Sequence, residues 1–473
     1  MAPLSTRRRT RSCRRCGSER KWHFCAGHHP PAAAAANQTD APPADPDLIS
    51  DLPDELLSTI VSVLPTKDVA RMQALSRRWR PIWPAAALNL NDERDFKPPY
   101  GGGAELAGLI TRILSAHRDR VPRLRLTTFQ CTATIDGLFQ HPALDKLEEL
   151  HFCYRFVMNR DPLPLSVLRF AELRVASYGR CRFPKHLGGR VAFPKLRELT
   201  LYKLTISERS LGAMISACTD LRSLFLRDSI GFRRVFVSSP TLVRFGIVNP
   251  MMEELVIVNA PSMEKLLLFD TYGGPRDVRV MFAPKLEVLG CLSRGMHNVE
   301  LQSTVFKELV AISPIEPLKA VNVFSLRAKD FKLDNVMDFL RCFPCREKLY
   351  FMVNPKRSYC EDESGQMLNS GPSIECLDRH LKEIVLMDYE GSSGGVKFAE
   401  FFIMNARVLK VMEFQLSSDC SKKWKAKQKR LLPKQKDRAS QAAKLNFVHR
   451  TYFGHYEDNS TQELLSYDNP FVC

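Results

Sequence analysis

Apolar residues recur at helical spacing in two short blocks after residue 50. Leu56, Leu57, Ile60, Val61, Val63 and Leu64 follow at helical spacing, which predicts an amphipathic helix that ends at Pro65. A second stripe continues through Val69, Met72, Leu75, Trp79 and Trp83. A unit this small cannot bury both stripes alone, because small domains bury little of their surface. We therefore expect a partner protein to cover it, or else the domain that follows.

Prolines shape this helical unit. Asp51 is suited to cap the first helix and Pro53 to its first turn, where a missing N–H costs little. Pro81 lies between Trp79 and Trp83 and favours a kink or a fresh helix start. The pattern therefore leaves open whether the two tryptophans share one helix face.

A different pattern, spaced as L-x-x-L-x-L, begins at Val121 and occurs eight times in register. Successive copies start 21 to 26 residues apart, within the period of leucine-rich repeats. One repeat cannot bury its apolar side, so repeats stack and their strands form a parallel sheet. The eight copies are Val121/Leu124/Leu126, Leu147/Leu150/Phe152, Phe170/Leu173/Val175, Leu196/Leu199/Leu201, Leu221/Leu224/Leu226, Leu242/Phe245/Ile247, Met263/Leu266/Leu268 and Leu286/Leu289/Cys291. Weaker copies continue to Phe414, one of them interrupted by Arg346.

Alternation along each strand directs the marked residues inward and their neighbours to a concave face. This face mixes both charges with aromatic side chains, which is more typical of a protein-binding surface than of a phosphate-binding track. A solvated face without a ligand is the alternative. The candidate target-binding residues are Arg125, His151, Arg174, Thr200, Tyr202, Phe225, Arg227, Lys265 and Phe269.

The net charge of +17 lies largely in two segments. Residues 1–39 contain a single acidic residue, Glu19, and an arginine cluster that is a candidate nuclear-import patch. Residues 422–438 carry nine basic residues and one acidic residue, and we expect a solvated basic helix there. A basic nuclear protein that binds nucleic acid is therefore one alternative function, although the acids on the concave face argue against it.

Cysteine and histidine spacing in the N-terminal segment suggests one metal site. Cys13 and Cys16, followed by Cys25 and His28, have the paired spacing of zinc ligands. The loop between the pairs is only eight residues long and other histidines compete, so we favour cysteines in a disordered basic tail. We accordingly expect neither a metal nor a cofactor.

Several other functions find no support in the sequence. The apolar runs are too short to span a bilayer, and no apolar segment follows the N-terminal arginines as a secretory signal requires. The fourteen cysteines form no dense framework, which favours buried thiols in a reducing compartment, hence the nucleus or cytoplasm. No group of residues has the order of a catalytic site, and we expect the protein not to be an enzyme.

Residues 52–57, 64–70 and 75–83 together resemble an F-box of the plant kind. In that family an apolar face docks on a Skp-type adaptor of a cullin–RING ubiquitin ligase. The contacts that the resemblance implies are Leu52, Pro53, Leu56, Ile60, Leu64, Pro65, Val69, Leu75, Trp79 and Trp83. Some of these residues will instead form the core of the helical unit, and the sequence does not sort them.

Residues 376–386, 396–402 and 405–410 resemble the FBD module, which follows an F-box and leucine-rich repeats in plant proteins. The fold class that we expect is an α/β leucine-rich repeat solenoid preceded by a small all-α F-box. Its expected parts are a disordered tail (1–46), the F-box (47–92), the repeats (104–353), the FBD module continuing the solenoid (375–416) and a basic C-terminal tail (417–473).

These observations favour the substrate-recognition subunit of a ubiquitin ligase. The F-box would bind a Skp-type adaptor, and a cullin through it, while the repeats hold an unknown target protein. An interaction scaffold without a ligase is the main alternative. We expect no membrane partner.

Overall fold

The computed structural model describes most of the chain between residues 49 and 449. The described residues are 49, 51–96, 103–117, 120–128, 132–155, 161–187, 191–249, 251–268, 275–293, 296–307, 310–312, 318–328, 333–353, 374–416 and 420–449. The chain divides between residues 52 and 53 into two compact units, and almost all described residues belong to the second. The expected disordered tail and the possible zinc ligands lie outside the described residues.

Three short helices form the helical unit: α1 (Asp54–Val63), α2 (Thr66–Leu75) and α3 (Trp79–Ala85). Pro53 and Pro65 precede the first two helices in extended conformation, and Pro65 separates α1 from α2. Pro81 lies in the first turn of α3, where a proline removes no intrahelical hydrogen bond. Helix α3 therefore runs through Pro81, and Trp79 and Trp83 lie one turn apart on the same side.

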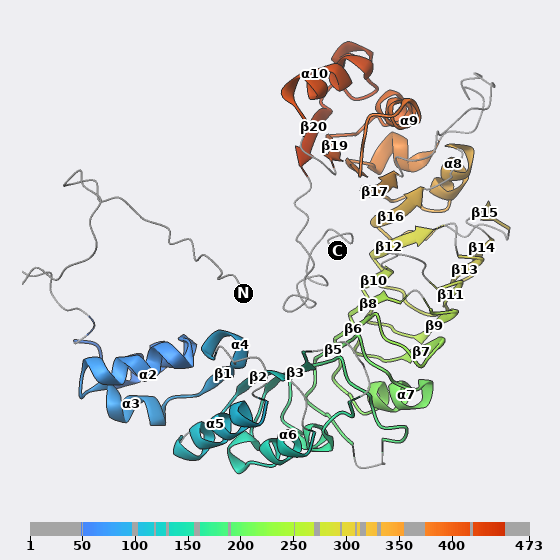
Figure 1. Cartoon of the computed structure of the whole chain (residues 1–473). Coiled ribbons are helices and arrows are strands. Elements are labelled where there is room, and N and C mark those ends of the chain that lie inside the picture. The colour runs from blue at the N-terminus through green and yellow to red at the C-terminus, as the bar shows by residue number, and fades with distance from the viewer. Residues whose placement is uncertain are drawn as a thin grey trace, which may run out of the picture. The chain divides into compact units, whose positions relative to one another are not determined.

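The main sheet contains fourteen strands, each parallel to its neighbours (Figure 1). In spatial order they are β1 (Asn89–Asn91), β2 (Arg123–Thr128), β3 (Glu149–Tyr154), β4 (Val175–Gly179), β5 (Glu198–Tyr202), β6 (Ser223–Arg227), β8 (Arg244–Val248), β10 (Lys265–Leu268), β12 (Val288–Ser293), β16 (Val323–Ala328), β17 (Lys348–Val353), β18 (Glu383–Met387), β19 (Val411–Leu416) and β20 (Lys444–His449). The order follows the sequence, as stacked repeats require. The predicted fold class, a leucine-rich repeat solenoid after a small helical unit, is confirmed.

Helices cover one face of this sheet near both of its ends (Figure 1). They are α5 (Gly103–Ala116), α6 (Thr132–Phe139), α7 (Glu208–Ser216), α8 (Leu333–Arg341), α9 (Ser393–Asn405) and α10 (Lys422–Leu431), with the short turns η1 (Pro142–Leu144), η2 (Leu165–Arg169), η3 (Cys376–His380) and η4 (Gln435–Asp437). The main core lies between these elements and the sheet. None of the helices in the described part of the chain is long and apolar enough to cross a bilayer.

In the middle repeats a second sheet replaces the helices, which the sequence did not predict. Its strands, in spatial order, are β15 (Val310–Ala311), β14 (Thr304–Lys307), β13 (Asn298–Leu301), β11 (Asp277–Val280), β9 (Glu254–Asn259) and β7 (Arg234–Ser238). Strands β7, β9 and β11 lie in the three repeats that start at Leu221, Leu242 and Met263, each 21 to 23 residues long, whereas β13, β14 and β15 lie in the longer interval that follows Leu286. A strand covers about twice the length of a helix per residue, so it crosses the repeat with fewer residues.

The expected register of one repeat was wrong by three residues: the trio predicted as Phe170/Leu173/Val175 is Leu173/Ala176/Tyr178. Strand β4 pairs Ala176 with Leu150 of β3, and Tyr178 with Phe152, so Ala176 and Tyr178 enter the core. Val175 therefore lies on the opposite face, although it was expected inside. The L-x-x-L-x-L pattern could not detect the shift, because apolar residues occupy both possible registers.

A bulge changes the register of β12 in a similar way. The ladder from β12 to β16 shifts between Leu289 and Leu292, and both of these leucines belong to the main core. Cys291 was expected inside but lies in a separate cluster with Tyr350 and Val385. The extra residue of the bulge moves Cys291 to the other face.

The solenoid extends beyond the predicted end at residue 416. Residues 422–431 form the expected basic helix, α10, and β20 then pairs with β19 along its whole length. Buried Gln428 of α10 bonds to the hydroxyl of Tyr389, so the helix is attached to the repeats. The segment 420–449 is therefore a further repeat, and its basic residues did not reveal this.

Arg346, which interrupts the repeat pattern, is completely buried. Its guanidinium carbon lies 4.4 Å from the ring centre of Phe324 and 4.5 Å from that of Phe343. None of its three side-chain nitrogens has a hydrogen-bond partner in the described part of the chain. Burial lowers the pKa of the guanidinium to about 9, which reflects the cost of a charge without water. The two rings offset only part of that cost.

Replacing Arg346 with an apolar side chain of similar length should therefore stabilise the protein. We expect Arg346→Met to raise the free energy of unfolding by about 1–4 kcal/mol, because it removes a buried charge. Arg209→Met, at an exposed position of helix α7, is the matched control and should change the free energy of unfolding by less than about 0.5 kcal/mol. Denaturant unfolding followed by circular dichroism measures both values. A loss of stability in Arg346→Met would contradict this interpretation.

Candidate functional site: helix α1, the first strand and the outer face

Helix α1 has apolar side chains on two sides. Leu57 and Val61 are buried within the helical unit. Leu56, Ile60 and Val63 are 50%, 37% and 66% exposed and lie four and three residues apart, in a row along the helix. We call these three residues the α1 row. Because the inner side of α1 already has its core, the α1 row is available for a partner.

The structure sorts the ten residues that the F-box resemblance implied. Val69 is only 2% exposed, so it belongs to the core, and its assignment as a surface contact was wrong. The side chain of Leu75 lies outside the described set. The remaining eight keep some exposure: Leu52, Pro53, Leu56, Ile60, Leu64, Pro65, Trp79 and Trp83. Val63, which the sequence pattern placed in the apolar stripe of this helix but not among the contacts, is also exposed.

Trp83 is attached to the first repeat. Its ring meets the ring of His117 edge-on, with 5.8 Å between their centres. His117 is buried, and its Nε2 lies 2.5 Å from the carbonyl oxygen of Ala86. At the other end of α3, Arg78 forms an ion pair with Asp54 of α1 at 2.8 Å. Helix α3 thus bridges α1 and the repeats.

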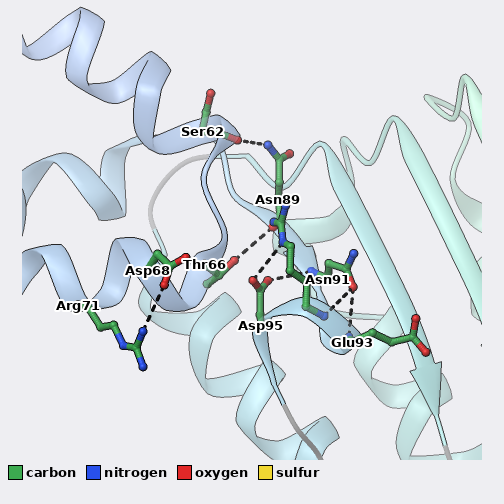
Figure 2. Close-up of polar contacts among 9 residues, drawn as sticks. Ser62, Thr66, Asp68, Arg71, Asn89, Asn91, Glu93 and Asp95 are labelled. Carbon is green, nitrogen blue, oxygen red and sulfur yellow. Dashed lines mark hydrogen bonds and ion pairs between the residues drawn. The ribbon is translucent and has the colours of Figure 1, made fainter. Parts of the chain in front are cut away.

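Strand β1 joins the helical unit to the main sheet, as Figure 2 shows. The side-chain amide of Asn89 donates to the carbonyl oxygen of Ser62 at the end of α1. The hydroxyl of Thr66 in α2 donates to the carbonyl oxygen of Asn89 at 3.2 Å. Asn89 itself pairs with Arg123 of β2. The ends of α1 and α2 are therefore hydrogen-bonded to the first strand of the solenoid.

Helix α4 (Asp92–Asp95) follows β1 directly and carries two buried carboxylates, Asp92 and Asp95. Asn91 caps this helix by accepting from the amides of Glu93 and Arg94. Asp92 Oδ2 accepts from the backbone amide of Thr127 in β2 at 2.8 Å. Burial raises the pKa of Asp92 to about 7, against the lowering effect of that hydrogen bond.

We call the side of the main sheet that faces away from the main core the outer face; it is the side predicted to be concave. The register of the strands aligns four of the predicted target-binding residues on this face. Arg125, His151, Thr200 and Phe225 form one row, with Ser177 between His151 and Thr200. Tyr202 and Arg227 form a second row, and Lys265 pairs with Arg244 in a third. The prediction that Arg174 lies on this face was wrong, because Arg174 precedes β4 and joins none of these rows. Phe269 lies outside the described residues.

The first part of the outer face is ionic. Glu93 lies 3.9 Å from Arg125 and 3.6 Å from Arg155, and Arg123 pairs with Glu149 at 3.0 Å. Burial, together with the charge of Arg125, lowers the pKa of His151 to about 4. His151 is therefore neutral at physiological pH and offers hydrogen bonds rather than a charge.

The later part of the outer face is apolar. Two clusters that contain only strand residues occupy it, and Val323 contacts both. We call them together the apolar strip: Phe225, Val248, Leu267, Val288, Val323, Cys291, Tyr350, Met352, Val385 and Met387. A regular leucine pattern does not predict this strip, because its members occupy the positions between the marked residues. In the described part of the chain no group of acidic, histidine and cysteine side chains is arranged to hold a metal ion.

The buried carboxylate of Asp92 makes the junction sensitive to pH. Its pKa is higher in the folded than in the unfolded chain, so folding takes up a proton between about pH 4 and 7 and stability falls as pH rises through that range. We expect Asp92→Asn to remove roughly 2–4 kcal/mol of this fall, while the oxygen that accepts from Thr127 remains. Unfolding free energies of both chains at pH 5 and pH 7.5 test this, and parallel pH profiles would contradict it.

Comparisons with known proteins agree with this arrangement. Residues 49–82 match the F-box-like family, residues 135–351 match the repeats of FBD-associated F-box protein At5g56370, and residues 370–414 match the FBD family. FBD-associated F-box protein At3g50710 of Arabidopsis thaliana is 26% identical, over 79% of this chain and 93% of its own. F-box/FBD/LRR-repeat protein At5g22660 of the same species is 24% identical, over 79% and 90% respectively. The chain therefore carries F-box, leucine-rich repeat and FBD domains, and its homologues are the F-box/FBD/LRR-repeat proteins of Arabidopsis thaliana.

Proposed function

We propose that this protein is the substrate-recognition subunit of a ubiquitin ligase built from a Skp-type adaptor and a cullin. The observation that carries the proposal is the α1 row. Leu56, Ile60 and Val63 are exposed on a helix whose other side is already buried. An F-box domain implies binding to a Skp-type adaptor, and the α1 row lies within the F-box match. An apolar row of this kind suits a partner that covers it with apolar side chains.

In this proposal the outer face of the repeats binds the target protein. Strand β1 and helix α3 connect the F-box to the repeats, so the bound target is held in a defined relation to the adaptor. The ubiquitin-transfer chemistry occurs on a neighbouring enzyme. The protein itself supplies a high effective concentration of target lysines near that enzyme and has no catalytic role. It acts in the nucleus or the cytoplasm.

The α1 row provides a direct test with purified full-length protein and a Skp-type adaptor. We expect Leu56→Ala combined with Ile60→Ala to weaken adaptor binding at least about tenfold, because truncation of central apolar anchors typically costs more than about 1 kcal/mol each. Both side chains face solvent, so the variant should keep its fold. Isothermal titration calorimetry measures the affinity.

Phe236→Ala is the matched control, because Phe236 is an equally exposed apolar residue on the second sheet. It should bind the adaptor like the unchanged protein. Equal affinity of the double variant and the control would refute the role of the α1 row. No binding by the unchanged protein would favour the scaffold function instead.

A further inference from the structure

Helix α10 carries a dense group of positive charges at the last repeat of the solenoid. It connects β19 to β20, the final two strands of the main sheet (Figure 1). The segment 420–449 contains ten lysine and arginine residues and one acidic residue, Asp437. Six of these cations belong to the helix, and we call them the α10 cations: Lys422, Lys423, Lys425, Lys427, Lys429 and Arg430.

The other side of the helix attaches it to the repeats. Trp424 packs against the main core, and buried Gln428 bonds to the hydroxyl of Tyr389. Five of the α10 cations are exposed, and Lys425 is half-buried. Within the described part of the chain none of the six forms an ion pair. Like charges at this spacing destabilise a helix, so an anionic partner would relieve a cost that these residues do not offset.

Helical spacing sorts the α10 cations into two rows, one on each flank of the exposed side. Members of a row follow each other at three or four residues, so their Cβ atoms are about 5–6 Å apart. Exposed Ala426 lies between the rows. The rows are Lys423/Lys427/Arg430 and Lys422/Lys425/Lys429.

Two parallel rows of cations with a small residue between them suit the major groove of duplex DNA. That groove is about 12 Å wide and admits an α-helix, which is about 10–12 Å across with its side chains. Each row then faces one phosphate backbone, and the methyl group of Ala426 leaves room for the helix to approach the groove. Contacts to phosphates position a protein without reading the base sequence.

The exposed side of α10 lacks the groups that other anionic partners use. A helix that lies in a membrane surface buries a large apolar face, whereas the large apolar side chain exposed on α10 is Leu431, at its last position. Protein interfaces are poor in lysine and depend on aromatic anchors. Single-stranded nucleic acid stacks on exposed aromatic rings, and the one aromatic ring of α10, Trp424, packs inward.

We propose that the α10 cations bind the phosphate backbones of duplex DNA, independently of base sequence. The binding does not depend on adaptor docking, because the α1 row and α10 adjoin opposite ends of the main sheet. One consequence rests on the proposed function: a protein bound in this way would select target proteins that are close to DNA.

Fluorescence anisotropy of a labelled DNA duplex of about 20 base pairs, titrated with the full chain, tests the proposal. With four to six phosphate contacts, the affinity should fall roughly 100- to 1,000-fold between about 50 and 200 mM salt. We expect the triple variant Lys423→Gln, Lys427→Gln and Arg430→Gln to bind at least about tenfold more weakly at 100 mM salt. Its salt dependence should also become shallower, by about one unit of slope for each lost contact. Glutamine has nearly the helix propensity of lysine, so α10 should persist.

The matched control removes the same charges from exposed positions on three other repeats. This variant combines Lys146→Gln, Arg209→Gln and Lys285→Gln, and its affinity should change by less than about twofold. The difference between the two variants separates α10 from the other basic segments of the chain. Equal losses in both variants would overturn the proposal, because the total charge and not α10 would then attract the DNA.

Lysine acetylation of the unchanged chain gives a second measurement that needs no variant. A saturating duplex should slow the acetylation of Lys423 and Lys427 at least about threefold and leave Lys146 and Lys285 unaffected, as followed by mass spectrometry. Unprotected lysines in α10 would overturn the proposal even if the triple variant does not fold.

The choice of partner is tested by competition with the labelled duplex. Phosphatidylserine vesicles, polyglutamate, single-stranded DNA and duplex RNA should each compete more weakly than unlabelled duplex DNA. Duplex RNA should be weak because its major groove is deep and narrow. A competitor from this group that matches duplex DNA would overturn the assignment of duplex DNA as the partner.

Discussion

One continuous ladder of parallel backbone hydrogen bonds, from β1 to β20, determines the position of every functional element in the described chain. It begins at Asn89, which also bonds to the ends of α1 and α2. The same ladder aligns side chains from successive repeats into rows on the outer face. Without β1 the α1 row would be attached to the repeats mainly through α3, and the two binding surfaces would lose their fixed connection.

The ladder also explains why the two faces of the sheet differ in chemistry. Inward residues must be apolar to bury the repeats against helices or the second sheet. Outward residues have no such requirement, and here they change along the solenoid from ionic pairs around Glu93 to the apolar strip with its cations. This change gives the molecule two kinds of contact on one face. In the proposed function, a target protein can contact either part.

Sequence patterns predicted the parts that depend on repetition. The period of about 23 residues gave the parallel sheet, and the helical rhythm near residue 50 gave α1 and α2. They failed where the pattern is satisfied in two ways, as at Val175 and Ala176, or where one inserted residue moves Cys291 to the other face. They also could not separate Val69 from Val63, because both are apolar and only their packing partners differ.

The proposed function depends on the α1 row as a docking surface, and hydrogen exchange tests this role most directly. Exchange of the full chain is followed by mass spectrometry with and without a purified Skp-type adaptor. If the adaptor docks on the α1 row, exchange in Asp54–Val63 slows when the adaptor is present, while Glu208–Ser216 of α7 exchanges at the same rate. Unchanged exchange in α1 at saturating adaptor, or protection confined to the repeats, would contradict it.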